Sequence, residues 1–96
     1  MPAYATLMMK IHDFAEYKKY QDVAIPLAKQ FGGKFLTRGH PVTNMEGGEY
    51  KDTLALVEFP SKQAAQDYFA DPEYQKIVGI RHGCTTTHHW MIQETD

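Results

Sequence analysis

The residue in this chain that is best suited to bind or activate a substrate is an arginine on an apolar helix face. Arg81 shares a predicted helical face with three apolar or aromatic residues, Tyr74, Ile77 and Val78. A buried charge without a partner is strongly unfavourable. The guanidinium would therefore either bind a substrate carboxylate or enolate through two parallel hydrogen bonds, or form a structural ion pair with Glu46, Glu58 or another carboxylate. The residue types alone leave both roles open.

A second candidate group lies where a predicted strand enters a long loop. Arg38, Gly39 and His40 leave the strand predicted over Lys34–Arg38 and begin the irregular segment 39–52. His40 has the side chain whose ordinary pKa suits a general base near neutral pH, although an exposed loop histidine is the simpler interpretation. We expect Arg38 to pair with Glu46, which would fix the loop. Loops of this length are often functional.

Aromatic and histidine side chains are the remaining candidates for lining a pocket. Tyr20 either points its hydroxyl into a pocket between the first helix and the sheet or packs in the core, as buried tyrosines usually do. His88 and His89 are neighbours on the last predicted strand, so we expect them on opposite faces. Whichever of them points inward, beside Trp90, would line a ligand cavity.

Metal and nucleophile chemistry have little support in the sequence. The five histidines lack the spacing of a metal site, so neither a metal ligand nor a bound cofactor is predicted. Cys84 follows a predicted helix C-terminus, where the helix dipole disfavours a thiolate. Ser61 is interpreted as a helix cap, because no Gly-x-Ser-x-Gly turn surrounds it.

Capping residues and apolar periodicity predict the elements that position these side chains. Asp13, with Glu16 three residues later, predicts a helix start, and Gly32-Gly33 predicts its end. Pro26 should kink that helix or end it early. Ser61 predicts a short helix, and Asp71-Pro72 predicts another that ends at Gly83. Strands are predicted over residues 3–11, 34–38, 53–59 and 86–93.

This order predicts an α+β fold of the ferredoxin-like βαββαβ type. A four-stranded antiparallel sheet would have its helices on one face only. The first and third strands are nevertheless apolar on both faces, and a monomer would leave a large apolar surface in water. We therefore predict a two-fold homodimer in which two sheets face one another.

Composition and charge narrow the class of protein. The 96 residues make one domain, 1–96, with a formal net charge of −2. No basic stripe interleaves with aromatic residues, so nucleic acid is not an expected partner. No apolar run reaches the roughly 20 residues of a membrane span, and the N-terminus lacks the features of a signal peptide. With a single cysteine, a cytoplasmic location is the simplest expectation.

Several short motifs together resemble the DUF1330 family of the dimeric α/β-barrel superfamily. The resemblance covers residues 4–92 and rests on Tyr17 and Tyr20, Pro26, Phe31–Leu36, Arg38-Gly39, Glu46-Gly47, Glu58–Ser61, Ala65, Tyr68, Pro72–Gln75 and Arg81. It implies a dimeric barrel and no settled activity, because this superfamily also contains cofactor-free monooxygenases, isomerases and haem-degrading enzymes. The chain departs from the family pattern in the polar, histidine-rich segment 85–92 and at His40.

Three functional hypotheses follow from these observations, of which the third is that the pocket is vestigial. The first is a cofactor-free enzyme acting on a small anionic or aromatic metabolite, with Arg81 and His40 as catalytic residues. Substrate would then be bound by a second set of side chains, Tyr20, Arg38, Glu46, His88 and Trp90. The second is a non-catalytic dimer that binds a metabolite or a protein partner. Convergence of a histidine and Arg81 on one cavity would favour the enzyme.

Overall fold

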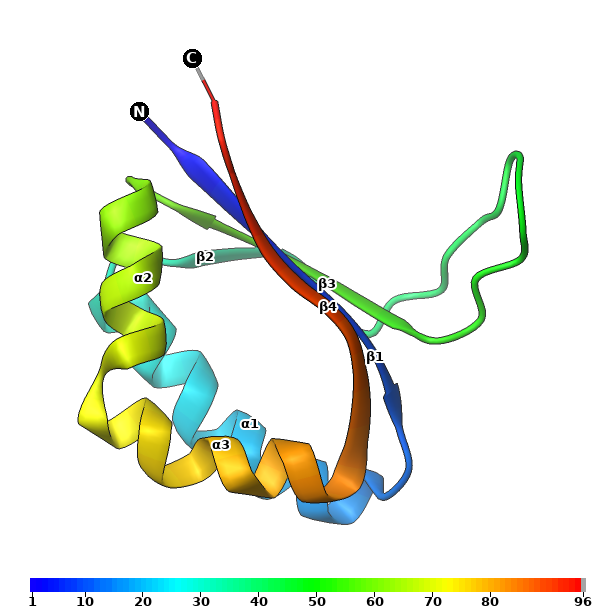
Figure 1. The fold of residues 1–96 in the computed structure, drawn as a ribbon, viewed down its shortest axis with the longest axis horizontal. Coiled ribbons are helices and arrows are strands. Elements are labelled where there is room, and N and C mark those ends of the chain that lie inside the picture. Colours follow the sequence, from blue (N-terminus) through cyan, green and yellow to red (C-terminus); the bar gives the residue numbers. More distant parts are fainter. Residues whose placement is uncertain (96) are drawn as a thin grey trace.

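The computed structural model describes residues 1–95 and contains four strands and three helices in the predicted order. The strands are β1 (Ala3–Ile11), β2 (Lys34–Thr37), β3 (Thr53–Phe59) and β4 (Thr85–Glu94), and the helices are α1 (Phe14–Gln30), α2 (Lys62–Ala70) and α3 (Pro72–Cys84). The strands form one antiparallel sheet in the order β2-β3-β1-β4. All three helices lie on the same side of this sheet (Figure 1). The predicted ferredoxin-like fold is confirmed.

Side-chain caps start the helices at the predicted residues. Three backbone N–H groups, of Glu16, Ala64 and Glu73, donate to the side chains of Asp13, Ser61 and Asp71 at 3.2, 3.0 and 2.8 Å. Gly32 follows α1 with φ of 83°, a conformation that favours glycine. The expectation that this helix ends early at Pro26 is wrong, since α1 continues to Gln30. Pro26 and Asp22 are both exposed, so the Asp22 carbonyl left without its helical donor faces water.

The two faces of the sheet differ in what covers them. On β1, the buried residues Ala3, Ala5, Leu7 and Met9 alternate with half-buried ones. The buried set faces the helices and forms the core with residues of α1, α2 and α3. The opposite face, which we call the open face, carries the half-buried Tyr4, Thr6, Met8, Leu54 and Leu56. No helix of residues 1–95 covers it, and the loop between β2 and β3 projects on that side (Figure 1).

A β-bulge in β4 changes the orientation predicted for one histidine. Met8 of β1 pairs with His89, but Met9 pairs with Thr87, so His88 is the extra residue. Bulges rotate the residues next to them. His88 therefore does not join Trp90 on the helix-facing side, and both histidines line a hollow on the open face beside Met8. The expectation that His88 and His89 point to opposite faces is wrong for this reason.

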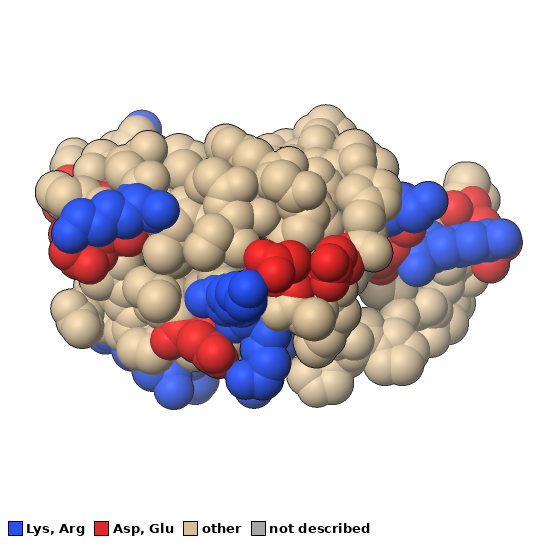
Figure 2. Space-filling view, turned by 90° about the horizontal axis from the view of Figure 1, so that it is seen from below, with Lys and Arg blue, Asp and Glu red and all other residues tan. Residues whose placement is uncertain are grey.

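The outer surface carries charges of both signs. Figure 2 shows one face of the molecule from below, on which lysine and arginine lie close to aspartate and glutamate and no continuous basic area forms. Exposed ion pairs lie along the helices, such as Lys18 with Asp22 at 3.2 Å and Lys76 with Glu73 at 2.8 Å. Within residues 1–95, no helix is both long and apolar enough to span a bilayer.

Candidate functional site

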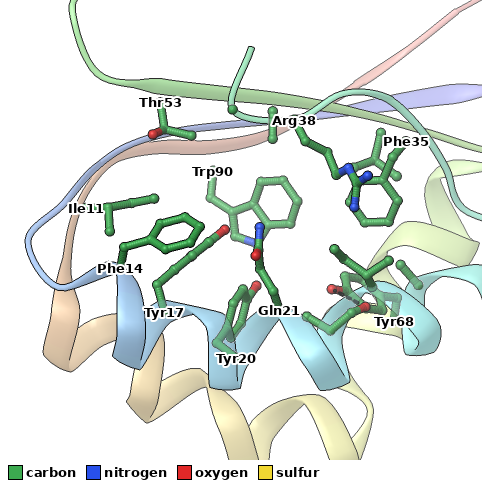
Figure 3. Close-up of a pocket in the computed structure, with 16 residues that line it drawn as sticks. Ile11, Phe14, Tyr17, Tyr20, Gln21, Phe35, Arg38, Thr53, Tyr68 and Trp90 are labelled. Carbon is green, nitrogen blue, oxygen red and sulfur yellow. Dashed lines mark hydrogen bonds between the residues drawn. The ribbon is translucent and has the colours of Figure 1, made fainter.

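A cavity of about 310 Å³ lies between α1 and the helix-facing side of the sheet. Its walls are mainly aromatic and aliphatic, with Tyr17, Tyr20 and Gln21 from α1 and Phe35, Val57 and Trp90 from the sheet. Figure 3 shows the Trp90 ring between the strands above and α1 below. A concave, mostly apolar cavity with a few polar groups is the usual form of a small-molecule site.

Arg38 is the one charged side chain among the sixteen residues that line this cavity. It is exposed at the end of β2, and its guanidinium points toward the cavity beside Phe35 (Figure 3). The predicted pair with Glu46 does not form. No carboxylate of the described residues lies within ion-pair distance of Arg38. The cavity therefore has a cationic group at its edge with no anionic partner from residues 1–95.

Trp90 contributes a second polar group without a partner. Its Nε1 is buried, and no hydrogen-bond acceptor among the described residues reaches it. An indole N–H usually finds an acceptor when it is buried. The Tyr17 hydroxyl points upward in the direction of Trp90 (Figure 3). Trp90 therefore brings an unused donor to the wall of a largely apolar cavity.

The tyrosines at this site are donors rather than bases. Burial raises the pKa of Tyr17 to about 12, although the Arg81 charge acts in the opposite direction. Burial also raises the pKa of Tyr20 and of Tyr68. The Tyr20 hydroxyl is hydrogen-bonded to the Tyr74 hydroxyl at 2.8 Å. Tyr20 thus lines the cavity with its ring, while its hydroxyl is used inside the core.

Arg81 is buried in α3 and does not line the cavity. Only 2% of its surface is exposed, and Nη1 donates to Thr87 Oγ1. Its guanidinium carbon lies 5.8 Å from the centre of the Tyr20 ring, a favourable cation–π distance. Nε has no acceptor in the described residues. Arg81 lies in the last turn of α3, where the helix dipole stabilises a cation.

The structural ion pairs considered for Arg81 are not formed. Glu58 instead accepts a hydrogen bond from the Tyr4 hydroxyl at 2.9 Å on the open face, and Glu46 is exposed in the loop between β2 and β3. Gly47 beside it has φ of 89°, as expected for a turn. Arg81 is therefore a buried cation that contacts the Thr87 hydroxyl and the Tyr20 ring and has no ion-pair partner within the described residues.

None of the five histidines is among the sixteen residues that line the cavity. His40 is exposed in the loop, where its Nδ1 accepts from the Arg38 backbone N–H at 3.2 Å. His88 Nε2 lies 2.8 Å from Asp52 Oδ2, and the Tyr50 ring packs against its imidazole. No group of three or more histidine, cysteine or acidic side chains within residues 1–95 is arranged to hold a metal ion.

Cys84 is a buried thiol with low expected reactivity. It is 4% exposed, and burial, together with the Asp13 and Glu16 charges, raises its pKa. Because the thiolate is the reactive form, we expect iodoacetamide to alkylate the folded protein at least about tenfold more slowly than the urea-unfolded chain. Mass spectrometry of timed samples measures both rates. Equal rates in the two states would contradict this prediction.

Part of the cavity wall is not predicted from the sequence. Tyr17, Gln21, Phe35 and Val57 line the cavity, and none of them is predicted as a site residue from the sequence. Gln21 could have been predicted from the sequence, because it lies four residues from both Tyr17 and Ile25 on the apolar side of α1. A polar side chain at such a position often faces a cavity. Phe35 and Val57 are indistinguishable from ordinary core residues before the strands are paired.

Comparison with known families identifies the class of protein. The family model described as a domain of unknown function, DUF1330, matches residues 2–95. The chain belongs to this family, in agreement with the resemblance seen in the sequence. No curated protein matches the chain significantly.

Solved structures with the same fold come from several bacteria. A protein of unknown function from Rhodopseudomonas palustris is 18% identical with a TM-score of 0.77, over 99% of this chain and 82% of that one. A dimeric ferredoxin-like protein of unknown function from Jannaschia sp. CCS1 is 17% identical with a TM-score of 0.75, over 99% and 100%. SnoaB, a cofactor-independent oxygenase from Streptomyces nogalater, is 10% identical with a TM-score of 0.70, over 99% and 93%. At these identities the similarity establishes the fold.

Proposed function

We propose that this protein is a homodimer that binds a small aromatic or aliphatic carboxylate in the cavity between α1 and the sheet. The observation that carries the proposal is the character of the cavity wall. It is apolar and aromatic, and its only charged side chain is Arg38, which has no carboxylate partner in the described residues. A cavity with such a wall is complementary to a ligand that is mostly apolar and carries a single anionic group.

The electrostatics of the site support an anion. No acidic side chain of residues 1–95 lines the cavity. The buried Arg81 charge lies over the Tyr20 ring, 5.8 Å from its centre, and no carboxylate of residues 1–95 forms an ion pair with it. Because the interior screens charge weakly, Arg81 adds positive potential to the cavity without contacting the ligand. A carboxylate at Arg38 would form charge-assisted hydrogen bonds, which are stronger than neutral ones.

Binding is favoured over proton-transfer catalysis by the absence of a base from the cavity lining. The sixteen lining residues include no histidine, aspartate or glutamate, and burial raises the pKa of Tyr17 to about 12. A general base works best with a pKa near the operating pH. The cofactor-free enzyme hypothesis, with His40 as base, would need the His40 side chain to turn into the cavity that its neighbour Gly39 lines. Although SnoaB shares the fold, the site favours a non-catalytic binding protein.

The open face of the sheet supports a dimer. Its half-buried Tyr4, Thr6, Met8, Leu54 and Leu56 form an apolar surface that no helix of the same chain covers. A second copy of the chain presents the same surface, so a two-fold axis would pair like with like. Similar proteins from Jannaschia sp. CCS1 and Bacteroides fragilis are described as dimeric.

Replacement of the cationic side chain tests the proposed function. We expect the wild-type protein to bind phenylacetate, and Arg38→Met to weaken this binding at least about tenfold, because a charge-assisted hydrogen bond is lost. Trp90 is the only tryptophan in the chain and lines the cavity, so its fluorescence reports binding directly, and calorimetry gives the affinity.

Lys34→Met provides a matched control for this experiment. Lys34 is an exposed cation at the start of the same strand, but it does not line the cavity. Its replacement changes the net charge by the same amount, and we expect unchanged affinity. Equal losses in both variants would mean that only the overall charge matters. Failure of the wild-type protein to bind phenylacetate and related carboxylates would overturn the proposed function.

A further inference from the structure

A second cavity lies next to the proposed ligand site. It also measures about 310 Å³ and is formed by α2, β1 and β4, with Ala5, Phe59, Ala65, Phe69 and Ile92 in its wall. Among the described residues, Gln66 is its one amide side chain and no charged side chain lines it. The two cavities therefore differ in character. The first carries a cation at its edge, and the second is almost entirely apolar.

Trp90 and Tyr68 are the side chains that line both cavities. The Tyr68 hydroxyl donates to the Ala24 carbonyl at 3.3 Å, so this ring is held in place from α1. Trp90 has no such bond, because its Nε1 lacks an acceptor in the described residues. It lies on β4, an edge strand of the sheet. Rotation of the Trp90 side chain would break no hydrogen bond within residues 1–95, and it would remove a wall that the two cavities share.

We propose that the two cavities are the two halves of one binding channel, that Trp90 divides them, and that the ligand is an elongated amphipathic carboxylate. Its carboxylate lies at Arg38, and its unbranched apolar chain passes Trp90 into the cavity beneath α2. A medium-chain fatty acid has this chemistry. The inference rests on the proposed function and deepens it, since it assigns the ligand's length and shape.

A series of straight-chain monocarboxylates tests the channel. We expect the affinity of the wild-type protein to rise from butanoate to dodecanoate by about fourfold for each methylene that enters the second cavity. The longer acids should also change the Trp90 emission spectrum, because their chains displace its ring. If butanoate and phenylacetate bind in an Arg38-dependent manner but affinity does not increase with chain length, the channel is wrong and the proposed function stands. If no carboxylate binds, both proposals fail.

A charge introduced at the far end of the channel tests where the apolar chain of the ligand lies. Gln66 is exposed at the second cavity, so Gln66→Lys should bind long α,ω-dicarboxylates about fivefold more tightly than the wild-type protein does. Dodecanoate should show no such gain. Gln63→Lys is the matched control, since Gln63 is exposed on the same helix and lines neither cavity. An equal gain in affinity for dicarboxylates in the two variants, or no gain in Gln66→Lys, would mean that the apolar chain of the ligand lies elsewhere and would overturn the proposal.

Discussion

Replacement of Tyr74 by alanine is expected to lower the free energy of unfolding by about 3–5 kcal/mol. Tyr74 is fully buried, and its ring packs against Tyr20, Tyr68 and Phe69 at centroid distances of 5.9, 4.9 and 5.1 Å. The variant would leave a void between α1, α2 and α3. Because a domain of this size is stabilised by only about 5–15 kcal/mol, urea denaturation followed by circular dichroism should show a much lower midpoint.

Tyr74→Phe separates the packing of the ring from the hydroxyl pair. It keeps the ring but leaves the buried Tyr20 hydroxyl without its 2.8 Å partner, which should destabilise the fold by about 1–2 kcal/mol. A loss as large as that of Tyr74→Ala would show that the hydroxyl pair, and not the aromatic packing, stabilises this contact. If Tyr74→Ala lowers the free energy of unfolding by less than about 1 kcal/mol, the packing of Tyr74 against its aromatic neighbours does not contribute to the core as expected.

The fold was predictable because its signals are local. Asp13, Ser61 and Asp71 are capping residues whose effect is confined to one helical turn, and all three caps form. The strands follow from runs of apolar residues between turn residues. Pro26 shows the limit of such reasoning, because its effect on a helix depends on whether the unpaired carbonyl faces water, and this is a tertiary property.

The site was less predictable because it depends on which strand residues face which layer. Trp90 and Arg38 were both expected at a pocket and do line the cavity. His88 does not, since a single extra residue in β4 reverses its orientation, and nothing in the sequence marks the bulge. Arg81 was correctly placed on a buried helix face, but only the packed structure shows that its guanidinium lies over the Tyr20 ring and does not line the cavity.

The arrangement of charges around the cavity suits retention of an anion. Arg38 is exposed and can contact a ligand directly, whereas Arg81 is buried with its guanidinium over the Tyr20 ring. An exposed cation is screened by water and salt, but a buried one is screened much less. The affinity for a carboxylate would therefore depend on Arg38 for the hydrogen bonds and on Arg81 for a field that persists at high salt.

A charge introduced on the open face of the sheet is also expected to have a large effect, in this case on the stability of the dimer. Leu56 lies on β3, paired with Thr6 of β1, and is half-buried although no helix covers it. In a two-fold dimer, Leu56→Lys would place a lysine on each of the two facing sheets, and burial of unpaired charges is strongly unfavourable. We expect the wild-type protein to sediment as a dimer and Leu56→Lys to dissociate at least about a hundredfold more readily.

Val23→Lys is the appropriate control, because it makes the same replacement of an aliphatic side chain on the outer surface of α1, where Val23 is 38% exposed. This variant should remain a dimer in sedimentation across the same dilution series. Dissociation of both variants would point to a general loss of stability, which circular dichroism would detect. A wild-type monomer, or a Leu56→Lys variant that sediments as the wild-type dimer does, would show that the open face is not the interface. The apolar residues of β1 and β3 would then need another cover.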